Sequence, residues 1–366
     1  MMVSKAIIGE RIRAARKLSG LSQQALADQV KVSKMAISKY ESGDVIPGSG
    51  MLLALGKALG VKVEFFLRPV SVTLRLPQYR CRKALTKKEE AMILGRTEDW
   101  LERYLTIERI TGAEAGLDLS SQDECRIRNV EDIEALALSV RTKWDLGLDP
   151  IENVMDVLEQ HGIKVGVLAA SEKFDALTLW YNHHPVIIVN KEMPGDRQRF
   201  SLAHELGHLL MQLESDLGTG AIPEKVDEMA ANRFAGAFLV PEEVAVRELG
   251  RERTRLDLRE LYLLKQKYGL SMAAWIYRAL DLGIITRDGA DRLRRELSIR
   301  GWRKIEPGKQ IPSEFPTQMR LLLLHARSER MISESRFAEL IGDDGIEGTD
   351  WICSGEVKTR AGEMCG

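Results

Sequence analysis

The pattern that most constrains this chain is a pair of histidines four residues apart within an apolar segment. His204 and His208 flank Glu205 in the order His-Glu-Leu-Gly-His. Residues four apart share one face of an α-helix, so the two imidazoles can point at one metal ion. The apolar neighbours predict a largely buried helix over residues 197–211, in which unpaired polar groups would be costly. These neighbours are Phe200, Leu202, Ala203, Leu206 and Leu209.

The residue types in this segment are those of a zinc-dependent hydrolase. Imidazole nitrogen is a common zinc donor, and a catalytic zinc takes three protein ligands and keeps one position for water. Glu205 would lie beside that position, where it can act as a general base. The pattern predicts one Zn²⁺ per chain and peptide-bond hydrolysis. The alternative is a buried helix that carries these residues by chance, for which the odds are about 1 in 100.

The third zinc ligand is expected on a second helix, over residues 225–239. Glu228 is the best candidate, because an antiparallel helix would bring its carboxylate to the metal. The carboxylates that compete for this role are Asp227 and Glu224. Among the other histidines, His183 and His184 are interpreted as turn residues that could line a cleft, and His161 as the end of a helix. No function is assigned to His325.

The N-terminal end of the chain is basic, although the whole chain has a net charge of only −1. Residues 1–68 contain eleven Lys and Arg against five Asp and Glu, a surplus of 11 − 5 = +6. A small basic segment joined to a near-neutral remainder indicates a polyanionic partner at that end. Double-stranded DNA is the leading candidate.

Four short helices are expected in this basic segment, over residues 8–18, 22–30, 33–41 and 49–59. Ser22 and Ser33 can cap the second and third, which a tight turn joins. Such a pair fits the major groove, with the second helix reading base edges. The residues expected to contact DNA are Gln23, Ser33, Lys34, Met35, Ser38 and Lys39, with Gln23 placed for a phosphate. The alternative is a helical bundle whose basic face contacts proteins.

The order of the later segments predicts a mainly α fold with a small β-sheet, an α+β arrangement. Strands are expected at residues 163–168, 176–181 and 185–190, between helices at 132–144 and 150–161 and those at 197–211 and 225–239. The expected domains are 1–68 for DNA binding, 69–129 as a helical connector, 130–250 around the metal motif, and 251–366 as a helical C-terminal region. The last region is interpreted only as a packing or dimerisation element.

The basic segment resembles the Cro/C1-type (Xre) helix-turn-helix family. The resemblance is carried by Leu21-Ser22-Gln23-Gln24-Ala25-Leu26-Ala27, Val32-Ser33 and Ile37-Ser38-Lys39-Tyr40-Glu41-Ser42-Gly43. It implies a DNA-binding domain over residues 9–67 and binding to an operator as a homodimer.

Residues 130–250 resemble the ImmA/IrrE family of zinc metallo-endopeptidases, a zincin-like fold. The matching stretches are residues 197–208, Asn232-Arg233-Phe234-Ala235 and Leu239-Val240-Pro241. The resemblance implies zinc ligands at His204, His208 and Glu228, with Glu205 as the catalytic acid/base. Family members cleave helix-turn-helix repressors, so it implies a gene-regulatory protease with such a repressor or another protein as its substrate.

The remaining expectations concern location and a rival function. The four cysteines are far apart, which predicts reduced thiols, and no apolar run approaches the roughly 20 residues that span a bilayer. A cytoplasmic protein that does not enter membranes is therefore expected. The rival to a regulatory peptidase is a transcriptional regulator whose second domain is a non-catalytic ligand sensor or dimerisation module. The intact Glu205 favours the peptidase.

Overall fold

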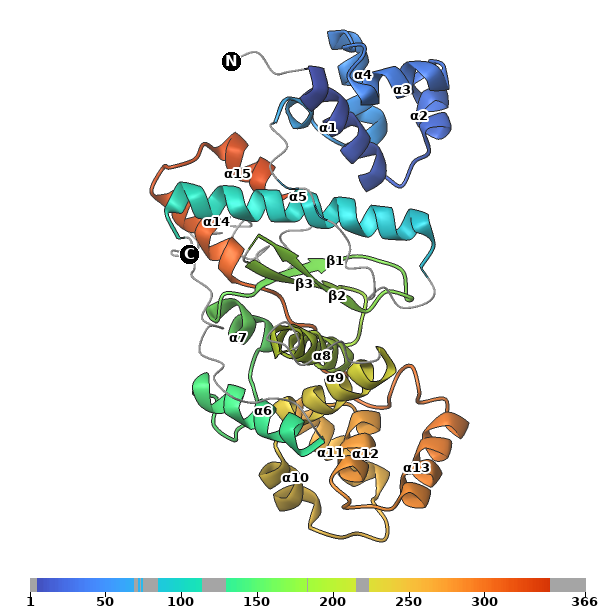
Figure 1. Cartoon of the computed structure of the whole chain (residues 1–366), viewed down its shortest axis with the longest axis vertical. Helices are drawn as coiled ribbons and strands as arrows, with labels where there is room; N and C mark the ends of the chain where they lie inside the picture. Colours follow the sequence, from blue (N-terminus) through green and yellow to red (C-terminus); the bar gives the residue numbers. More distant parts are fainter. Residues whose placement is uncertain are drawn as a thin grey trace, which may run out of the picture.

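The computed structural model describes residues 5–68, 72, 74, 85–113, 130–182, 184–214 and 224–342. Within these ranges the chain is mostly helical with a three-stranded sheet (Figure 1), which confirms the α+β prediction. No helix in the described ranges has both the length and the hydropathy needed to cross a bilayer. All four cysteines and His183 lie outside these ranges.

The N-terminal domain is built from the four helices that the sequence predicts. They are α1 (Lys5–Leu18), α2 (Gln23–Val30), α3 (Lys34–Ser42) and α4 (Ser49–Leu59), followed by the short 3₁₀ helix η1 (Val63–Leu67). Ser22 and Ser33 accept hydrogen bonds from Ala25 N and Ala36 N, as their predicted capping roles require. Buried apolar side chains of α1, α2, α3, α4 and η1 form the core of the domain, and Val32 and Leu52 pack against it partly buried.

The domain packs against the long helix α5 (Lys87–Thr111) through α1 (Figure 1). Arg11 donates two hydrogen bonds of 2.7 Å to the carboxylate of Glu102, and both side chains are buried. A bidentate pair of this kind fixes orientation as well as distance. The N-terminal domain is therefore held on α5 at a defined angle rather than joined only by a linker.

The sheet lies between α5 and the helix that carries the histidine pair. Its strands β1 (Lys164–Leu168), β2 (Ala176–Tyr181) and β3 (His184–Asn190) are ordered β1-β3-β2, with β1 parallel and β2 antiparallel to β3. Successive side chains of a strand point to opposite faces. Accordingly, Ile187 and Val189 belong to the core that surrounds the histidine helix, whereas Val186 and Ile188 belong to the core under α5.

The remaining helices are α6 (Val130–Lys143), α7 (Val154–Gln160), α8 (Gly195–Glu214), α9 (Glu224–Leu239), α10 (Glu242–Leu249), α11 (Leu258–Tyr268), α12 (Met272–Asp281), α13 (Arg287–Ile299), α14 (Gln318–Ser328) and α15 (Glu334–Ile341). Most of these helices lie below the sheet, whereas α14 and α15 pack beside α5 (Figure 1). Helix α7 begins at Val154 rather than at Pro150, because Asn153 caps it by accepting from Asp156 N. One hydrophobic core runs from α6 through α13, across the predicted boundary at residue 250.

Candidate metal centre

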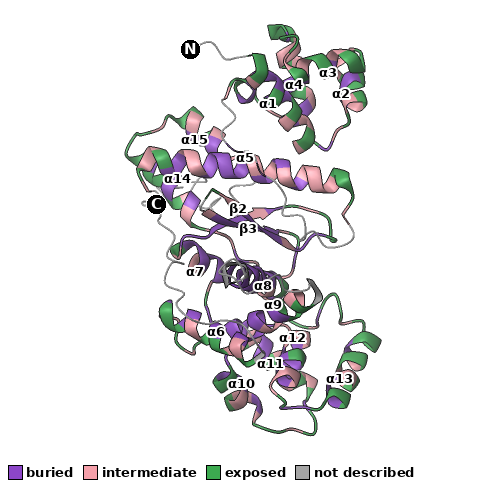
Figure 2. Cartoon of the chain, viewed as in Figure 1, coloured by how far each residue is buried: buried purple, intermediate pink, exposed green. Residues whose placement is uncertain are grey.

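The histidine pair lies on α8, which packs closely against α9. The two helices run antiparallel, since His204 faces Asn232 whereas His208 faces Asp227. Gly207 permits the close approach, because a Cβ there would lie 3.0 Å from the ring of Phe234. The middle of α8 is buried (Figure 2), as its apolar pattern predicts.

Three side chains converge between the helices. His204 Nε2 and His208 Nε2 are 3.0 Å apart. Glu228 places one carboxylate oxygen 3.6 Å from His204 Nε2 and the other 3.4 Å from His208 Nε2. One ligand atom from each residue lies within 4.8 Å of the other two, so a single ion could contact all three. The histidine side chains are 8% and 2% exposed and that of Glu228 is 45% exposed, so the cluster opens to solvent beside Glu228.

The second nitrogen of each imidazole faces a polar partner on α9. His204 Nδ1 is 3.1 Å from Asn232 Oδ1, and His208 Nδ1 is 3.1 Å from Asp227 Oδ2. Such partners fix the ring orientation and leave the other nitrogen for a metal. Asp227, considered from the sequence as a competing ligand, thus lies on the side of His208 away from the cluster. The side chain of Glu224, the other competitor, is outside the described set.

Glu205 is held by Thr178, a residue that belongs to no sequence motif of the site. Thr178 on β2 donates a hydrogen bond of 2.6 Å from Oγ1 to Glu205 Oε2, and both residues are buried. The hydroxyl therefore fixes one oxygen of the glutamate. Thr178 is 27 residues from Glu205 in the chain, so no local spacing indicates this contact. Only the packing of β2 on α8 reveals this partner.

The first turn of α8 is anchored by a buried ion pair. Lys265 on α11 is 2.7 Å from Asp196 and 3.0 Å from Glu306, and its side chain is fully buried. Burial opposes the charge of Lys265, yet the two carboxylates outweigh it and raise the pKa of this lysine. Glu306 also accepts from Met272 N and Ala273 N at the start of α12. The helix that carries the histidines is thus tied to α11 and α12, outside the predicted 130–250 domain.

A second anchor comes from the segment between α13 and α14. Glu314 forms an ion pair with Arg199 of α8 and accepts hydrogen bonds from Val154 N and Met155 N at the start of α7. Its own amide donates to Gln198 Oε1 at 2.8 Å. Burial raises the pKa of the Glu314 carboxyl despite the neighbouring Arg199. These contacts hold α8 at a fixed depth beneath the sheet.

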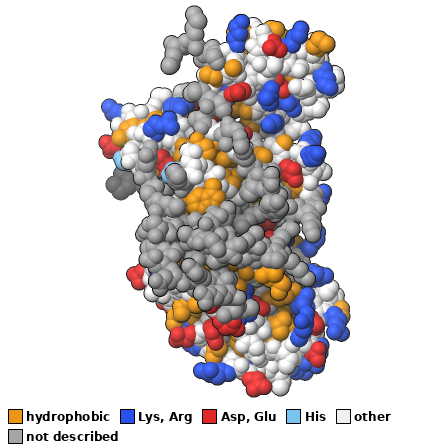
Figure 3. Space-filling model, viewed as in Figure 1, with side chains coloured by type: hydrophobic (Ala, Val, Ile, Leu, Met, Phe, Trp, Pro, Cys, Tyr) orange, Lys and Arg blue, Asp and Glu red, His pale blue; other side chains and the backbone are white. Residues whose placement is uncertain are grey.

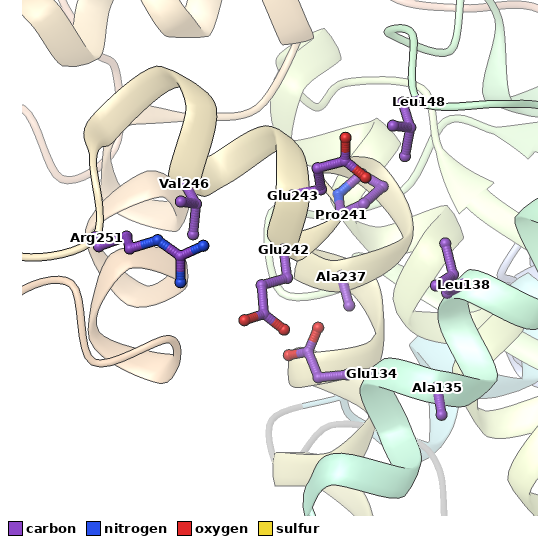
Figure 4. Close-up of a pocket in the computed structure, with 10 residues that line it drawn as sticks. All are labelled: Glu134, Ala135, Leu138, Leu148, Ala237, Pro241, Glu242, Glu243, Val246 and Arg251. Atoms are coloured by element: carbon purple, nitrogen blue, oxygen red, sulfur yellow. The ribbon is translucent and has the colours of Figure 1, made fainter.

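A separate hollow of about 440 Å³ lies at the far end of α9 from the histidine cluster (Figure 4). Glu134, Glu242 and Glu243 border it with Arg251. Glu134 is already paired with Arg278, at 2.6 Å. This hollow contributes no residue to the metal-ligand cluster.

The predicted DNA-reading face is exposed. Lys and Arg side chains are spread over the N-terminal domain (Figure 3), and α3 lies on the side away from α5 (Figure 1). All four α3 side chains expected to read bases are exposed, namely Lys34, Met35, Ser38 and Lys39. The capping residue Ser33 is exposed as well. The face is therefore open to a DNA duplex.

The buried carboxylate of Glu41 engages Arg16 and Gln23 in this domain. Glu41 is buried in α3 and forms an ion pair with Arg16. Gln23 Nε2 donates to Glu41 Oε2 at 2.9 Å, which leaves its second N–H for a phosphate. The guanidinium of Arg16 thus helps to neutralise the Glu41 carboxylate inside the fold.

The other described histidines are not part of the three-residue cluster. His161 follows α7 as its C-cap and stacks on Trp144 with ring centroids 4.1 Å apart, which confirms the helix-end interpretation. His184 begins β3 and His325 lies in the last turn of α14.

Comparison with known proteins identifies both parts. Residues 12–66 match the family described as "Helix-turn-helix", and residues 158–280 match the "IrrE N-terminal-like domain". The chain therefore combines an Xre-type helix-turn-helix domain with an IrrE-like peptidase-family domain, as the sequence motifs predict. The second match extends past residue 250 into α12.

Individual relatives match one part or the other. Repressor protein C2 of Salmonella phage P22 is 44% identical over 62 residues, 17% of this chain and 29% of that protein. Radiation response metalloprotease IrrE of Deinococcus radiodurans is 34% identical over 105 residues, 25% of this chain and 32% of that protein. The IrrE of Deinococcus deserti is 27% identical over 165 residues, 38% of this chain and 58% of that protein. The chain thus spans less than two thirds of each relative.

Proposed function

We propose that the chain is a DNA-binding transcriptional regulator whose second domain is a zinc-dependent endopeptidase that cleaves a repressor-type protein. The observation that carries the proposal is the convergence of His204, His208 and Glu228, with Glu205 on the same helix as both histidines. Two imidazoles and one carboxylate form a donor set typical of catalytic zinc, with a position left for water. The match to an IrrE-like domain supports the same assignment.

The residues of the site would divide the work between binding and proton transfer. A zinc ion held there would lower the pKa of water and polarise the carbonyl of the peptide to be cut. Glu205 would take the proton of the attacking water on its carboxylate and deliver it to the departing amine. Thr178 would keep that carboxylate in one orientation, while Asn232 and Asp227 would orient the two imidazoles.

A repressor-type substrate follows from the combination of the two domains. This part of the proposal rests on the fusion with a helix-turn-helix domain and on the likeness to a phage repressor and to IrrE metalloproteases. A domain that selects an operator would place the peptidase near repressors bound at the same DNA. Homodimeric operator binding and a cytoplasmic location, where the chromosome is accessible, belong to the same proposal.

The test is cleavage of a co-expressed helix-turn-helix repressor encoded beside the gene. Glu205→Gln should abolish cleavage while zinc content and operator binding stay at wild-type levels, because the carboxylate is not among the metal ligands. Glu243→Gln on the exposed start of α10 is the matched control and should cleave normally. Cleavage that persists in Glu205→Gln would refute the catalytic role. A zinc-loaded wild-type chain that cuts none of these repressors would favour the sensor or dimerisation alternative.

A further inference from the structure

A cavity of about 630 Å³ lies where the N-terminal domain meets the body of the chain. Its walls come from η1 and the residues before it, from one face of α5, from β1, and from α14 and α15. Figure 1 shows α14, α15 and β1 beside α5. The volume falls within the range of roughly 300–1,000 Å³ usual for small-molecule sites.

The walls of this cavity carry an excess of positive charge. Six cationic side chains line it, namely Lys62, Arg68, Arg96, Arg103, Lys191 and Arg320, against two carboxylates, Asp99 and Glu339. Both carboxylates are already engaged. Asp99 pairs with Arg103 at 3.0 Å, and Glu339 pairs with Arg68. The cavity as a whole therefore favours an anion.

Two of the arginines lack, among the described residues, a counter-charge or a hydrogen-bond acceptor that an anion would supply. Arg320 forms no ion pair with a carboxylate in the described part of the chain, and its guanidinium carbon lies 5.6 Å from the ring centroid of Phe315. Its partial burial lowers the pKa of the guanidinium, which means that the surroundings disfavour the charge. Arg68 Nε is buried and has no acceptor among the described residues. A buried donor without an acceptor is costly unless a ligand or water completes it.

The cavity also offers apolar surface beside its charges. Trp100 and Met319 line it with Phe315, and Phe65 of η1 closes it on the side of the N-terminal domain. Guanidinium groups bind phosphate through paired hydrogen bonds and also stack on planar rings. Phosphate groups and one planar apolar group are therefore the features that a matching ligand should combine.

We propose that this cavity binds a nucleoside polyphosphate, with its phosphates near Arg320, Arg68 and Lys62 and its base against the aromatic wall. The proposal is independent of the peptidase assignment, because the cavity shares no residue with the histidine cluster. The ligand would touch both the DNA-binding domain and the body, so its binding would reinforce the contact already made by Arg11 and Glu102.

The test is isothermal titration of the full zinc-loaded chain with ATP, tripolyphosphate, orthophosphate and adenosine. ATP should bind with a Kd below 1 mM, more tightly than each of the other three. Arg320→Gln should weaken ATP binding at least tenfold, and Lys62→Gln should weaken it measurably. Arg292→Gln on exposed α13 is the matched control and should leave the Kd unchanged. Lys34→Ala with Lys39→Ala should also leave it unchanged, because those lysines face DNA.

The outcomes separate the proposed cavity from other polyanion sites. Polyphosphates chelate zinc, so His204→Ala with His208→Ala should retain ATP binding, and its loss there would overturn the proposal. Equal weakening by Arg320→Gln and Arg292→Gln would reduce the binding to nonspecific charge and overturn it as well. Tripolyphosphate binding as tightly as ATP would refute the role of the aromatic wall. Lys62 is exposed, so its variant tests the cavity even where loss of Arg320 impairs folding.

Discussion

Replacing the two neighbouring carboxylates of α9 should separate a zinc ligand from a residue that only orients one. Glu228 faces the shared side of both imidazoles, whereas Asp227 faces the opposite nitrogen of His208 at 3.1 Å. Glu228→Ala should therefore remove one of three ligands and abolish stoichiometric zinc binding. Asp227→Asn should leave all three ligands in place but loosen the ring of His208 and lower its basicity.

The magnitude for Asp227→Asn follows from its place behind the histidine. Loss of such a partner weakens metal affinity by about 10- to 100-fold, or about 1.4–2.7 kcal/mol. At a free zinc concentration about 100 times the wild-type Kd, bound metal stabilises the fold by about 2.7 kcal/mol. The same concentration would stabilise Asp227→Asn by only about 0.4–1.4 kcal/mol.

The assay is competition for zinc against a chromogenic chelator, with urea unfolding at fixed free zinc as the second readout. Asn232→Ala, which removes the partner of His204, should behave like Asp227→Asn. The reasoning is refuted if Asp227→Asn abolishes zinc binding while Glu228→Ala retains wild-type affinity. That result would make Asp227 the third ligand.

Three further predictions concern the base, the DNA face and a buried acid. Thr178→Val should lower kcat by about 10- to 100-fold, because a hydrogen bond to a charged group contributes about 1.5–3 kcal/mol. Thr178→Ser should restore kcat at unchanged zinc content. A wild-type kcat in Thr178→Val would exclude the positioning role. Lys34→Ala with Lys39→Ala should weaken operator binding in a gel-shift assay by about 1–3 kcal/mol per lost base contact, whereas equal affinity would exclude α3 as the reading helix. Burial raises the pKa of Glu159 from 4.5 to about 7, so the folded state holds its proton more tightly than the unfolded chain. The contribution of protonated Glu159 to the free energy of unfolding should be complete below pH 4.5 and fall up to about pH 7, by at most about 1.4 kcal/mol per pH unit. In urea unfolding across this range, the free energy of unfolding of Glu159→Gln should fall less steeply with pH than that of the wild type. An identical slope would contradict the shifted pKa.

The sequence by itself was sufficient for features set by local spacing. The four N-terminal helices, their serine caps and the strand over residues 176–181 follow from residues close to one another in the chain. The pairing of His204 with His208 also follows locally, because one turn of helix places them together whatever surrounds it. Glu228 could be selected as a candidate because it opens a predicted helix near the motif.

Other features depended on contacts between distant segments. The opposite orientations of Asp227 and Glu228 follow from the rotation of α9 against α8, which Gly207 and Phe234 set by their close approach. No periodicity in the sequence specifies that rotation, since both carboxylates are neighbours on the same helix. The choice between them therefore required the packed pair of helices.

The partners of Glu205 and of α8 were also decided by tertiary packing and not by local sequence. Thr178 reaches Glu205 because β2 crosses beside α8, and Glu314 reaches Arg199 from 115 residues away. A hydroxyl or carboxylate in an isolated strand or loop has many available partners in water. Which one it binds is decided when burial removes that water and leaves one donor or acceptor within reach. The proposed chemistry of the site could thus be inferred from five consecutive residues, whereas the contacts that hold these residues in place exist only in the folded chain.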